Sequence, residues 1–312
     1  METERLLRGA VPAATATAAP TARPAGSLRL RSYLELTKPR ITALVMVTAA
    51  AGFYLGGAGQ FDLLLFLHAM LGTAIVAAGT SAMNQVLERD VDALMKRTRN
   101  RPLPAGRLTT VDAALFAGSL AAVGILYLTL AVNALTGALA LTTFLSYDFL
   151  YTPLKRVHSF STVIGAVPGA LPIVGGWAAA AGTIGPEAGV LFGVLFLWQL
   201  PHFLALAWIL RDDYDAAGLR MLSVGDTDAF QTRHQTLIYT LVLLPVTLLP
   251  TMIGLAGTFY FGAALVLGLG FVWASLRFWR DATPDVARKL FRYSILYLPV
   301  LLLLLVADRV RG

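Results

Sequence analysis

Residues 65–92 read LFLHAMLGTAIVAAGTSAMNQVLERDVD, an apolar run that ends in a short acidic segment. About 20 apolar residues in a helix cross the roughly 30 Å hydrocarbon core of a bilayer. Residues 65–86 reach that length, so the stretch predicts a membrane-spanning helix with ionisable side chains at one end. Ionisable groups at the end of an otherwise apolar helix are costly, and their presence indicates function.

Eight further apolar runs have this length or nearly so. The nine predicted spans cover residues 41–58, 65–86, 112–131, 134–152, 161–180, 188–209, 236–255, 258–276 and 292–308. The chain has 312 residues, of which 57% are hydrophobic and 14% charged, whereas soluble domains carry about 25% charged residues. We therefore expect an all-α integral membrane protein with about nine transmembrane helices around a central cavity.

The basic residues are segregated by these spans. Of the 25 Lys and Arg residues, 23 fall on the side of the N-terminus if the chain crosses nine times. Basic loops stay in the cytoplasm, which predicts a multi-pass protein of the cell (plasma or inner) membrane, with the N-terminus cytoplasmic and the C-terminus outside. The short tail and compact loops favour a bacterial membrane over the mitochondrial inner membrane.

The net charge of +7 follows from this topology and from attraction to anionic lipid. It therefore calls for no nucleic-acid partner. The chain has no cysteine, which excludes disulfides, thiolate metal sites and a cysteine nucleophile.

The sequence predicts a short tail and one membrane domain. Residues 1–30 are rich in Ala, Thr, Pro and Arg and lack a continuous apolar segment, so we expect a disordered cytoplasmic tail rather than a secretory signal. A mitochondrial presequence is the other reading, and Glu2 and Glu4 weaken it. Residues 31–312 then form the polytopic membrane domain, and a short helix along the interface is expected near residues 33–40.

Two long polar loops, 87–111 and 210–235, follow the second and sixth spans. Each carries acidic residues first, then basic ones, then a Pro or Gly turn. The four-span offset indicates two related halves, each contributing one acidic cluster to a shared cavity on the cytoplasmic side. Membrane proteins built from repeats often place their site at the repeat interface.

Asn84, Glu88 and Asp92 are spaced four residues apart, which places them on one face of a helix. An amide oxygen and two carboxylates are hard ligands that suit Mg²⁺, an ion that keeps several waters and usually bridges carboxylates to substrate phosphates. The spacing therefore predicts a magnesium site. The alternatives are a solvated helix end and a polar contact between helices.

We call Asn84, Glu88 and Asp92 the ladder. A basic segment follows it. We expect Arg97 and Arg101 to bind diphosphate oxygens, because guanidinium groups bind phosphate in bidentate fashion. The other reading is a lipid-facing basic patch that enforces topology. Asp90 points away from the ladder and is expected to pair with Arg89 or Lys96.

A second acidic segment, residues 211–215, contains Asp212, Asp213 and Asp215. It can supply a second metal or balance the arginines, and spacing does not settle which carboxylate faces the cavity. The run Trp-Gln-Leu-Pro-His-Phe ending at residue 203 precedes it. Its His202 is either hydrogen-bonded to a neighbouring helix or a substrate contact, and both readings stay open.

The loop after the fourth span offers Tyr147, Asp148, Tyr151, Lys155 and Arg156. The last two are also the whole positive-inside signal of that loop. From the residues alone, a role in membrane topology is therefore the favoured reading of Lys155 and Arg156.

These motifs together resemble the UbiA-type intramembrane prenyltransferases. The pattern Asn84-x-x-x-Glu88-x-x-x-Asp92, followed by the Arg-Thr-x-x-Arg-Pro-Leu run at 97–103, looks like the first aspartate-rich motif of that family, in the form found in its heme-farnesylating branch. Further segments match that branch, namely 36–40, 151–156, 198–203, 213–214 and 221–222. The resemblance runs from about residue 33 to the C-terminus. It departs at Ser161, where the family often has Asn, and at Ile173, where a second Pro is common.

The resemblance implies transfer of the farnesyl group of farnesyl diphosphate to a vinyl group of heme b (protoheme IX), with addition of water. The products are heme O and diphosphate, in the biosynthesis of heme A for cytochrome oxidase. Mg²⁺ is the implied cofactor, and heme b is substrate rather than prosthetic group. The implied partners are farnesyl diphosphate, heme b and the lipid bilayer, and a downstream heme A synthase is an open addition.

The resemblance also implies residue roles. The implied catalytic and metal-binding residues are Asn84, Glu88, Asp92 and Asp213. The implied substrate-binding residues are Arg97, Arg101, Tyr151, Lys155, Arg156 and His202.

Two other functions fit parts of the sequence. One is a UbiA-type prenyltransferase that acts on a different acceptor, such as a quinone precursor or chlorophyllide. The other is a secondary transporter, which also has many spans and buried carboxylates. Transporter sites lie near the bilayer midplane, whereas the charges here lie at helix ends, which disfavours transport.

Overall fold

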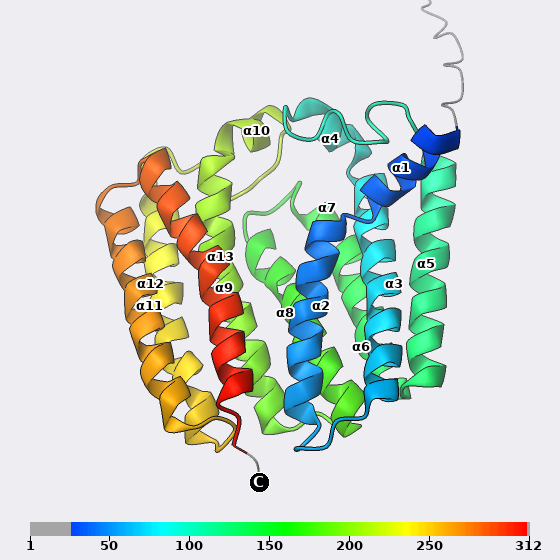
Figure 1. Ribbon diagram of the computed structural model, residues 1–312. Helices are drawn as coiled ribbons and strands as arrows, with labels where there is room; N and C mark the ends of the chain where they lie inside the picture. The colour runs from blue at the N-terminus through cyan, green and yellow to red at the C-terminus, as the bar shows by residue number, and fades with distance from the viewer. Residues whose placement is uncertain (1–25, 311–312) are drawn as a thin grey trace, which may run out of the picture.

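The computed structural model describes residues 26–310, and this part of the chain is almost entirely helical (Figure 1). The long helices are α2 Pro39–Gly56, α3 Leu63–Leu87, α5 Thr110–Ala131, α6 Ala134–Leu145, α8 Ser161–Ala181, α9 Pro186–Ile209, α11 Phe230–Met252, α12 Thr258–Arg280 and α13 Pro284–Ala307. Within the described residues, eight of them, all but α6, are long and apolar enough to cross a membrane. The expected all-α membrane architecture is confirmed.

The ninth expected span, residues 134–152, is a composite helix. α6 continues directly into the π-helix η1, Ser146–Tyr151, and then into the single turn α7, Thr152–Leu154. The N–H of Thr152 donates to the carbonyl of Tyr147, five residues earlier. Such π-helical turns occur frequently at functional sites. The predicted count of nine is therefore approximate. Within the described residues there are eight continuous membrane-spanning helices and one span made of α6, η1 and α7.

Two helices begin earlier than their apolar runs. α11 starts at Phe230 instead of residue 236, and α13 starts at Pro284 instead of residue 292. Pro284 is at the first helical position, where its missing N–H costs nothing and its fixed φ suits the helix. Hydropathy locates the part of a helix that lies in hydrocarbon, whereas local start signals set where the helix itself begins.

Three short helices lie at one end of the bundle (Figure 1). They are α1 Gly26–Leu36, α4 Arg89–Leu94 and α10 Arg211–Ala216. We call this end the α4–α10 end. The helix expected at 33–40 is α1, which begins and ends earlier than predicted. Of the predicted tail, residues 1–25 lie outside the described part of the chain and residues 26–30 belong to α1.

α8 is the central helix and packs against α2, α6 and α9. Its approach to α2 depends on glycine. A Cβ atom at Gly176 would lie 1.9 Å from the carbonyl oxygen of Ala49, and one at Gly52 would lie 2.0 Å from that of Ile173. Small residues let helix backbones approach closely in membranes, where lipid competes with ordinary hydrophobic contacts. The glycine positions therefore fix the α2–α8 pair.

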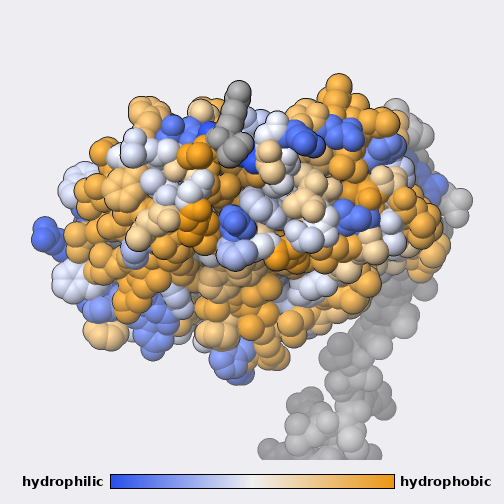
Figure 2. All heavy atoms as spheres, turned by 90° about the horizontal axis from the view of Figure 1, so that it is seen from below, coloured by the Kyte–Doolittle hydropathy of each residue, from blue (hydrophilic) through white to orange (hydrophobic). Residues whose placement is uncertain are grey.

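The outer surface of the bundle is apolar. Large hydrophobic side chains there are strongly exposed, for example Leu130 at 76%, Met252 at 73% and Val266 at 71%. Figure 2 looks at the end opposite α4 and α10, and hydrophobic residues dominate its outline while hydrophilic ones form scattered patches. A protein in water rarely exposes so much apolar surface, so these side chains face lipid.

Candidate active site

Asn84, Glu88 and Asp92 lie where α3 meets α4. α3 ends at Leu87, and Glu88, with φ −99° and ψ 7°, separates the two helices, so the ladder does not belong to one uniform helix as predicted. The N–H of Glu88 still donates to the carbonyl of Asn84, and the N–H of Asp92 to that of Glu88, over 3.0 and 2.8 Å. The three residues therefore stay stacked, and they are buried, with 2%, 8% and 0% exposure.

Each of these three oxygen-bearing side chains contacts a different cation. The pairs are Lys38 with Asn84, Lys155 with Glu88, and Arg101 with Asp92. Arg101 donates to both carboxylate oxygens of Asp92, over 2.9 and 2.7 Å, the bidentate geometry that makes such pairs strong. The oxygen atoms of the ladder thus stabilise positive charge beside them, and in this structure three basic side chains provide that charge.

Burial and charge act against each other at these groups. Burial disfavours ionisation of Glu88, but the Lys155 ammonium group outweighs it and holds the pKa of the carboxyl below its ordinary value. Burial acts to lower the pKa of Lys155. The neighbouring Tyr151 and Glu88 outweigh burial, so the pKa of Lys155 is raised above its ordinary value. For Asp92, burial outweighs Arg101 and raises the pKa. The Glu88–Lys155 pair is therefore ionised at neutral pH.

Lys38 is the site residue that sequence reasoning missed. It lies between α1 and α2 with φ 46° and ψ 64°, a left-handed conformation that a side chain rarely adopts. Its Nζ atom donates to Oδ1 of Asn84 over 2.7 Å. Burial, followed by the charge of Arg101, lowers the pKa of Lys38 to about 8. The signal in the sequence was Pro39, because the residue before a proline is disfavoured in a helix.

The amide of Asn84 is held in one orientation. Its Nδ2 atom donates to Oγ1 of Thr152 over 3.1 Å. The Thr152 hydroxyl in turn donates to the carbonyl of Tyr147 over 2.9 Å, so it can only accept from the amide. Oδ1 of Asn84 therefore faces Lys38. Groups that orient a metal ligand in this way are a regular part of metal sites.

The composite span supplies further predicted residues. Nζ of Lys155 lies 4.8 Å from the centroid of the Tyr151 ring, so Tyr151 lies next to the cation that pairs with Glu88. Arg156 donates to the carbonyl of Leu87 over 2.8 Å, at the end of α3, where a cation is favourable. Arg156 therefore supports the helix end and does not contact the oxygen donors in this structure.

The two acidic loops meet at the α4–α10 end. Val91 and Met95 of the first loop share a buried cluster with Leu219 and Met221 of the second. The N–H of Arg220, between those two residues, donates to the carbonyl of Lys155 over 3.0 Å. The loops that follow the second, fourth and sixth spans thus form one layer over the same end of the bundle. The predicted meeting of the two acidic clusters in a shared cavity stays a prediction.

Asp213 and Arg97 lie at the edge of this layer. The Asp213 side chain is half-buried and Arg97 is exposed, whereas the Asp212 side chain is 99% exposed and points to solvent. In residues 26–310, no three His, Asp or Glu side chains converge closely enough to hold a metal ion. Asp213 therefore does not complete a cluster with Glu88 and Asp92 here. Asp90, as predicted, pairs with Arg89, over 2.9 Å.

The donor set at the ladder fits Mg²⁺. That ion binds a few protein oxygens, usually carboxylates, and completes its octahedral shell with waters and substrate phosphates. Asn84 offers an oriented amide oxygen, and Glu88 and Asp92 offer buried carboxylates. Each of the three side chains already contacts a basic group. Their oxygen atoms therefore suit Mg²⁺, which would compete with those basic groups.

A cavity of about 520 Å³ lies next to the ladder. Its walls come from α2, α3, α6, α8, α9 and α13, and most of the lining side chains are apolar. Thr80 and Ser81, one turn before Asn84, line it together with Tyr147 and Tyr151. Among the described residues, neither the ladder nor its basic partners line the cavity, which is mostly apolar and has polar side chains at the end nearest the ladder. The expected central cavity is present.

His202 lines this cavity, together with Trp198 and Gln199. Its Nδ1 atom lies 2.7 Å from Oγ of Ser294 on α13. The imidazole stacks between two aromatic rings, with centroid distances of 5.0 Å to Trp198 and 4.7 Å to Phe291. The first reading of this histidine, a hydrogen bond to a neighbouring helix, is confirmed. The second, a substrate contact, stays a prediction, and the place of His202 in the cavity wall is compatible with it. His202 is distant in sequence from the ladder and contacts none of its residues.

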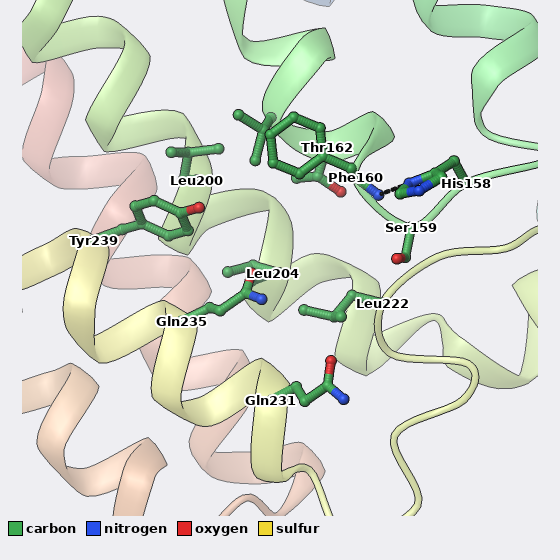
Figure 3. A pocket seen from close by; sticks show the side chains of 11 residues that line it. His158, Ser159, Phe160, Thr162, Leu200, Leu204, Leu222, Gln231, Gln235 and Tyr239 are labelled. Carbon is green, nitrogen blue, oxygen red and sulfur yellow. Dashed lines mark hydrogen bonds between the residues drawn. The ribbon is translucent and has the colours of Figure 1, made fainter.

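A second, smaller cavity of about 150 Å³ lies on the other side of α9 (Figure 3). Leu200 and Leu204 line it opposite Gln231 and Gln235 of α11. His158 lies at its rim, where Nδ1 accepts a hydrogen bond from the N–H of Phe160. It shares no lining residue with the central cavity and contains none of the predicted site residues.

These features define a class of protein. A polytopic helical bundle holds oxygen donors and basic side chains at one end and an apolar cavity behind them, which is the arrangement of an intramembrane enzyme acting on an anionic head group with an apolar tail. The profile of the UbiA prenyltransferase family matches residues 45–298, and the chain belongs to that family.

Several relatives carry one name. The chain is 44% identical over 289 residues to a protoheme IX farnesyltransferase of Solibacter usitatus, an alignment that covers 90% of this chain and 99% of the relative. It is 46% identical over 288 residues to the protoheme IX farnesyltransferase of Opitutus terrae, with 92% and 97% covered.

Solved structures share the fold at lower identity. A digeranylgeranylglyceryl phosphate synthase structure matches with a TM-score of 0.76 at 17% identity, covering 90% of this chain and 98% of that one. A UbiA homologue from Archaeoglobus fulgidus, bound to GPP and Mg²⁺, matches with a TM-score of 0.65 at 16% identity, covering 88% and 99%. These likenesses establish the fold.

Proposed function

We propose that this chain is a Mg²⁺-dependent farnesyltransferase that joins the farnesyl group of farnesyl diphosphate to a vinyl group of heme b, with addition of water, and releases heme O and diphosphate. Two lines support the proposal. The relatives at 44 and 46% identity over nine-tenths of the chain carry the name protoheme IX farnesyltransferase. The ladder of oxygen donors and basic side chains lies beside a large, mostly apolar cavity, which fits a substrate with a charged head group and an apolar tail.

The pairing of each ladder residue with a basic side chain is the observation that supports binding of the diphosphate group. Three buried oxygen donors and three partly buried cations are interleaved in one layer. If Asn84, Glu88 and Asp92 held Mg²⁺, their basic partners would be free to bind the phosphate oxygens of the substrate. The same residues thus fit both parts of a metal–diphosphate complex, and no charge is left unpaired.

The basic side chains act on the bond that breaks. When the allylic C–O bond of farnesyl diphosphate breaks, the electron pair leaves with the diphosphate. Lys38, Lys155 and Arg101 lie where they stabilise that growing negative charge, which is often the largest contribution to catalysis. Mg²⁺ held by Asn84, Glu88 and Asp92 supplies Lewis-acid stabilisation of the same charge. Asp213 is proposed to support the site from the second loop, and Arg97 to reach the outer phosphate.

The acceptor then reacts with the allylic carbon. The terminal vinyl carbon of heme b forms the new C–C bond, and the adjacent carbon, next to the porphyrin ring, takes hydroxyl from water while a proton is released. Water that reached the allylic carbon first would hydrolyse the diphosphate instead. The apolar walls of the cavity exclude bulk water from that carbon, so the bundle favours the vinyl group as nucleophile.

We also propose an orientation in the plasma or inner membrane. The α4–α10 end carries most of the basic loops, and basic loops stay in the cytoplasm. On this basis the N-terminus and the diphosphate site face the cytoplasm and the C-terminus faces outside. Cysteine-accessibility labelling tests this orientation directly, because the chain has no native cysteine.

The activity test uses purified protein in nanodiscs with heme b, farnesyl diphosphate and Mg²⁺, and reads the product by mass spectrometry. The expected product is heme heavier by a farnesyl group plus water, and it disappears with a chelator or in Asp92→Asn. If heme stays unchanged while farnesyl diphosphate is consumed, the acceptor is wrong and a quinone precursor or chlorophyllide is tested next. If neither substrate changes in folded protein, the transferase proposal fails.

A further inference from the structure

We infer that Nε2 of His202 is the axial ligand of the iron in the heme acceptor, which makes His202 the residue that selects a metalloporphyrin over a metal-free one. The inference rests on the proposed function, because it presumes that a heme occupies the central cavity. It starts from the hydrogen bonds of one side chain, Ser294, on α13.

The Ser294 hydroxyl fixes which ring nitrogen of His202 carries the proton. Oγ of Ser294 donates its single proton to the carbonyl of Phe291 over 2.7 Å. It can therefore only accept from His202, whose Nδ1 lies 2.7 Å away. Nδ1 then carries the hydrogen, and Nε2 of the neutral ring carries a lone pair. A neutral imidazole that donates its other N–H to an oriented acceptor is the usual form of a metal-bound histidine.

The lone pair of Nε2 has no competing partner. Among residues 26–310, His202 makes one hydrogen bond, through Nδ1, and otherwise contacts aromatic rings. Trp198 is held in turn, because its Nε1 donates to the carbonyl of Ser294 over 2.8 Å. The ring is thus fixed by α9 and α13 together, with its free nitrogen on a side chain that lines the cavity.

The other three histidines of the chain are placed elsewhere. His68 bonds the Tyr127 hydroxyl, His158 accepts from a backbone N–H, and His234 bonds the carbonyl of Phe230. None of the three lines the central cavity. The structure therefore leaves His202 as the histidine that a ligand in this cavity can meet.

The cavity wall next to His202 suits a flat ligand. α8 packs on α9, and the small or rigid residues that it contributes to the lining are Gly165, Pro168, Gly169, Pro172 and Gly175. A Cβ atom at Gly175 would meet nothing within 4 Å. Cβ atoms at Gly165 and Gly169 would meet the side chains of Tyr151 and Gln199. The open part of this wall is therefore the end at Gly175, which can lie against the face of a planar macrocycle that His202 binds from the neighbouring helix.

The test is titration of the full chain in nanodiscs with hemin (ferric protoporphyrin IX), without farnesyl diphosphate, followed by absorption, EPR and resonance Raman spectroscopy. Wild type is expected to give a histidine-ligated ferric spectrum. In His202→Ala that ligation is lost and hemin binds roughly tenfold or more weakly, and added imidazole restores the histidine-type spectrum. His158→Ala and His234→Ala are matched controls and keep the wild-type spectrum.

Metal-free protoporphyrin IX and two further variants sharpen the test. Wild type and His202→Ala should bind the metal-free porphyrin equally, because it offers no iron. Ser294→Ala, which removes the acceptor of the Nδ1 hydrogen, should weaken hemin binding by about tenfold with the ligation intact. Gly175→Leu should lower the affinity for both porphyrins by filling the cavity. Thermal unfolding of each variant shows that it is folded.

The inference is overturned if His202→Ala keeps the wild-type spectrum, if a control histidine proves to be the ligand, or if wild type produces heme O while hemin shows no histidine ligation. That last result leaves the proposed function intact. If His202 ligates hemin but no farnesylated heme forms with any donor, the proposed function fails and the ligand assignment stands. Absence of hemin binding in folded wild type overturns both.

Discussion

Nζ of Lys38 lies 2.7 Å from Oδ1 of Asn84, which joins the start of the first membrane helix to the end of the second. The contact depends on a strained residue, because Lys38 adopts φ 46°. Such strain at a non-glycine residue costs about 1–3 kcal/mol and persists where the surrounding structure imposes it. The chain thus keeps a lysine at a position that glycine would occupy with less strain, which indicates that the charge itself is required.

Replacing Lys38 tests that requirement. Lys38→Met should lower kcat/KM for farnesyl diphosphate by about 10²-fold, since one buried donor to the leaving group is lost, while thermal stability changes little. Steady-state kinetics with the heme product read by mass spectrometry gives the number. Arg40→Met is the matched control, because Arg40 is basic, exposed and two residues away, and it should behave like wild type. Equal losses in both variants would contradict a specific role.

Metal and diphosphate should bind with strong mutual dependence. A metal ion alone has to displace Lys38, Lys155 and Arg101 from the ladder and leave these partly buried cations without partners, which is unfavourable. With Mn²⁺ as an EPR-visible substitute, affinity should rise about tenfold or more when the unreactive farnesyl thiodiphosphate is present, and linkage requires the reciprocal effect. A protein-free titration corrects for metal bound by the analogue itself. Equal Mn²⁺ affinity with and without the analogue would contradict the proposal that metal and diphosphate together replace the contacts between the ladder and its basic partners.

Asp148 offers a stability prediction. It has 0% exposure, and among the described residues neither of its carboxylate oxygens has a hydrogen-bond partner. Burying a carboxyl group requires either an unpaired buried charge or uptake of a proton, and both cost free energy that a neutral amide avoids. Asp148→Asn should therefore raise the free energy of unfolding by about 1 kcal/mol or more. Thermal unfolding in detergent measures this. Asp212→Asn, at a side chain that is 99% exposed, should leave the midpoint unchanged; a lower midpoint for Asp148→Asn would show that the carboxylate is needed.

The α2–α8 contact should be intolerant of side chains. Gly176→Leu should destabilise the protein by about 1–3 kcal/mol or more, because overpacking forces two backbones apart. Gly118→Leu is a suitable control, since a Cβ atom there would meet nothing within 4 Å. Thermal unfolding of both variants in the same detergent gives the comparison. If Gly176→Leu unfolds at the temperature of the control, the close approach is not needed for stability.

Much of this architecture follows from sequence periodicity. Apolar length predicted the spans, because the bilayer imposes a minimum on every crossing. Four-residue spacing predicted that Asn84, Glu88 and Asp92 stack, and they do so even though α3 ends at Leu87. Adjacent residues of opposite charge predicted the pair of Asp90 with Arg89. These are local effects, and one sequence contains all the information that they need.

The remaining features depend on contacts between distant segments. The hydrogen bond of Lys38 to Asn84 bridges 46 residues, and that of Asn84 to Thr152 bridges 68. No local pattern fixes which basic side chain reaches which oxygen, so the sequence indicated a basic site but not its pairing. The tautomer of His202 likewise depends on Ser294, 92 residues later.

The π-helix η1 sets the direction in which the residues beyond it point. Each residue of an α-helix turns the chain by about 100°, and a π-helical turn contains an extra residue relative to an α-helical one, so each π-helical residue turns the chain by less. If residues 146–151 closed as an α-helix of the same length, everything beyond them would rotate about the helix axis. Lys155 would then move away from Glu88, although no side chain in the site had been changed. The backbone geometry of this segment, as much as the chemistry of its side chains, therefore places Lys155 in the site.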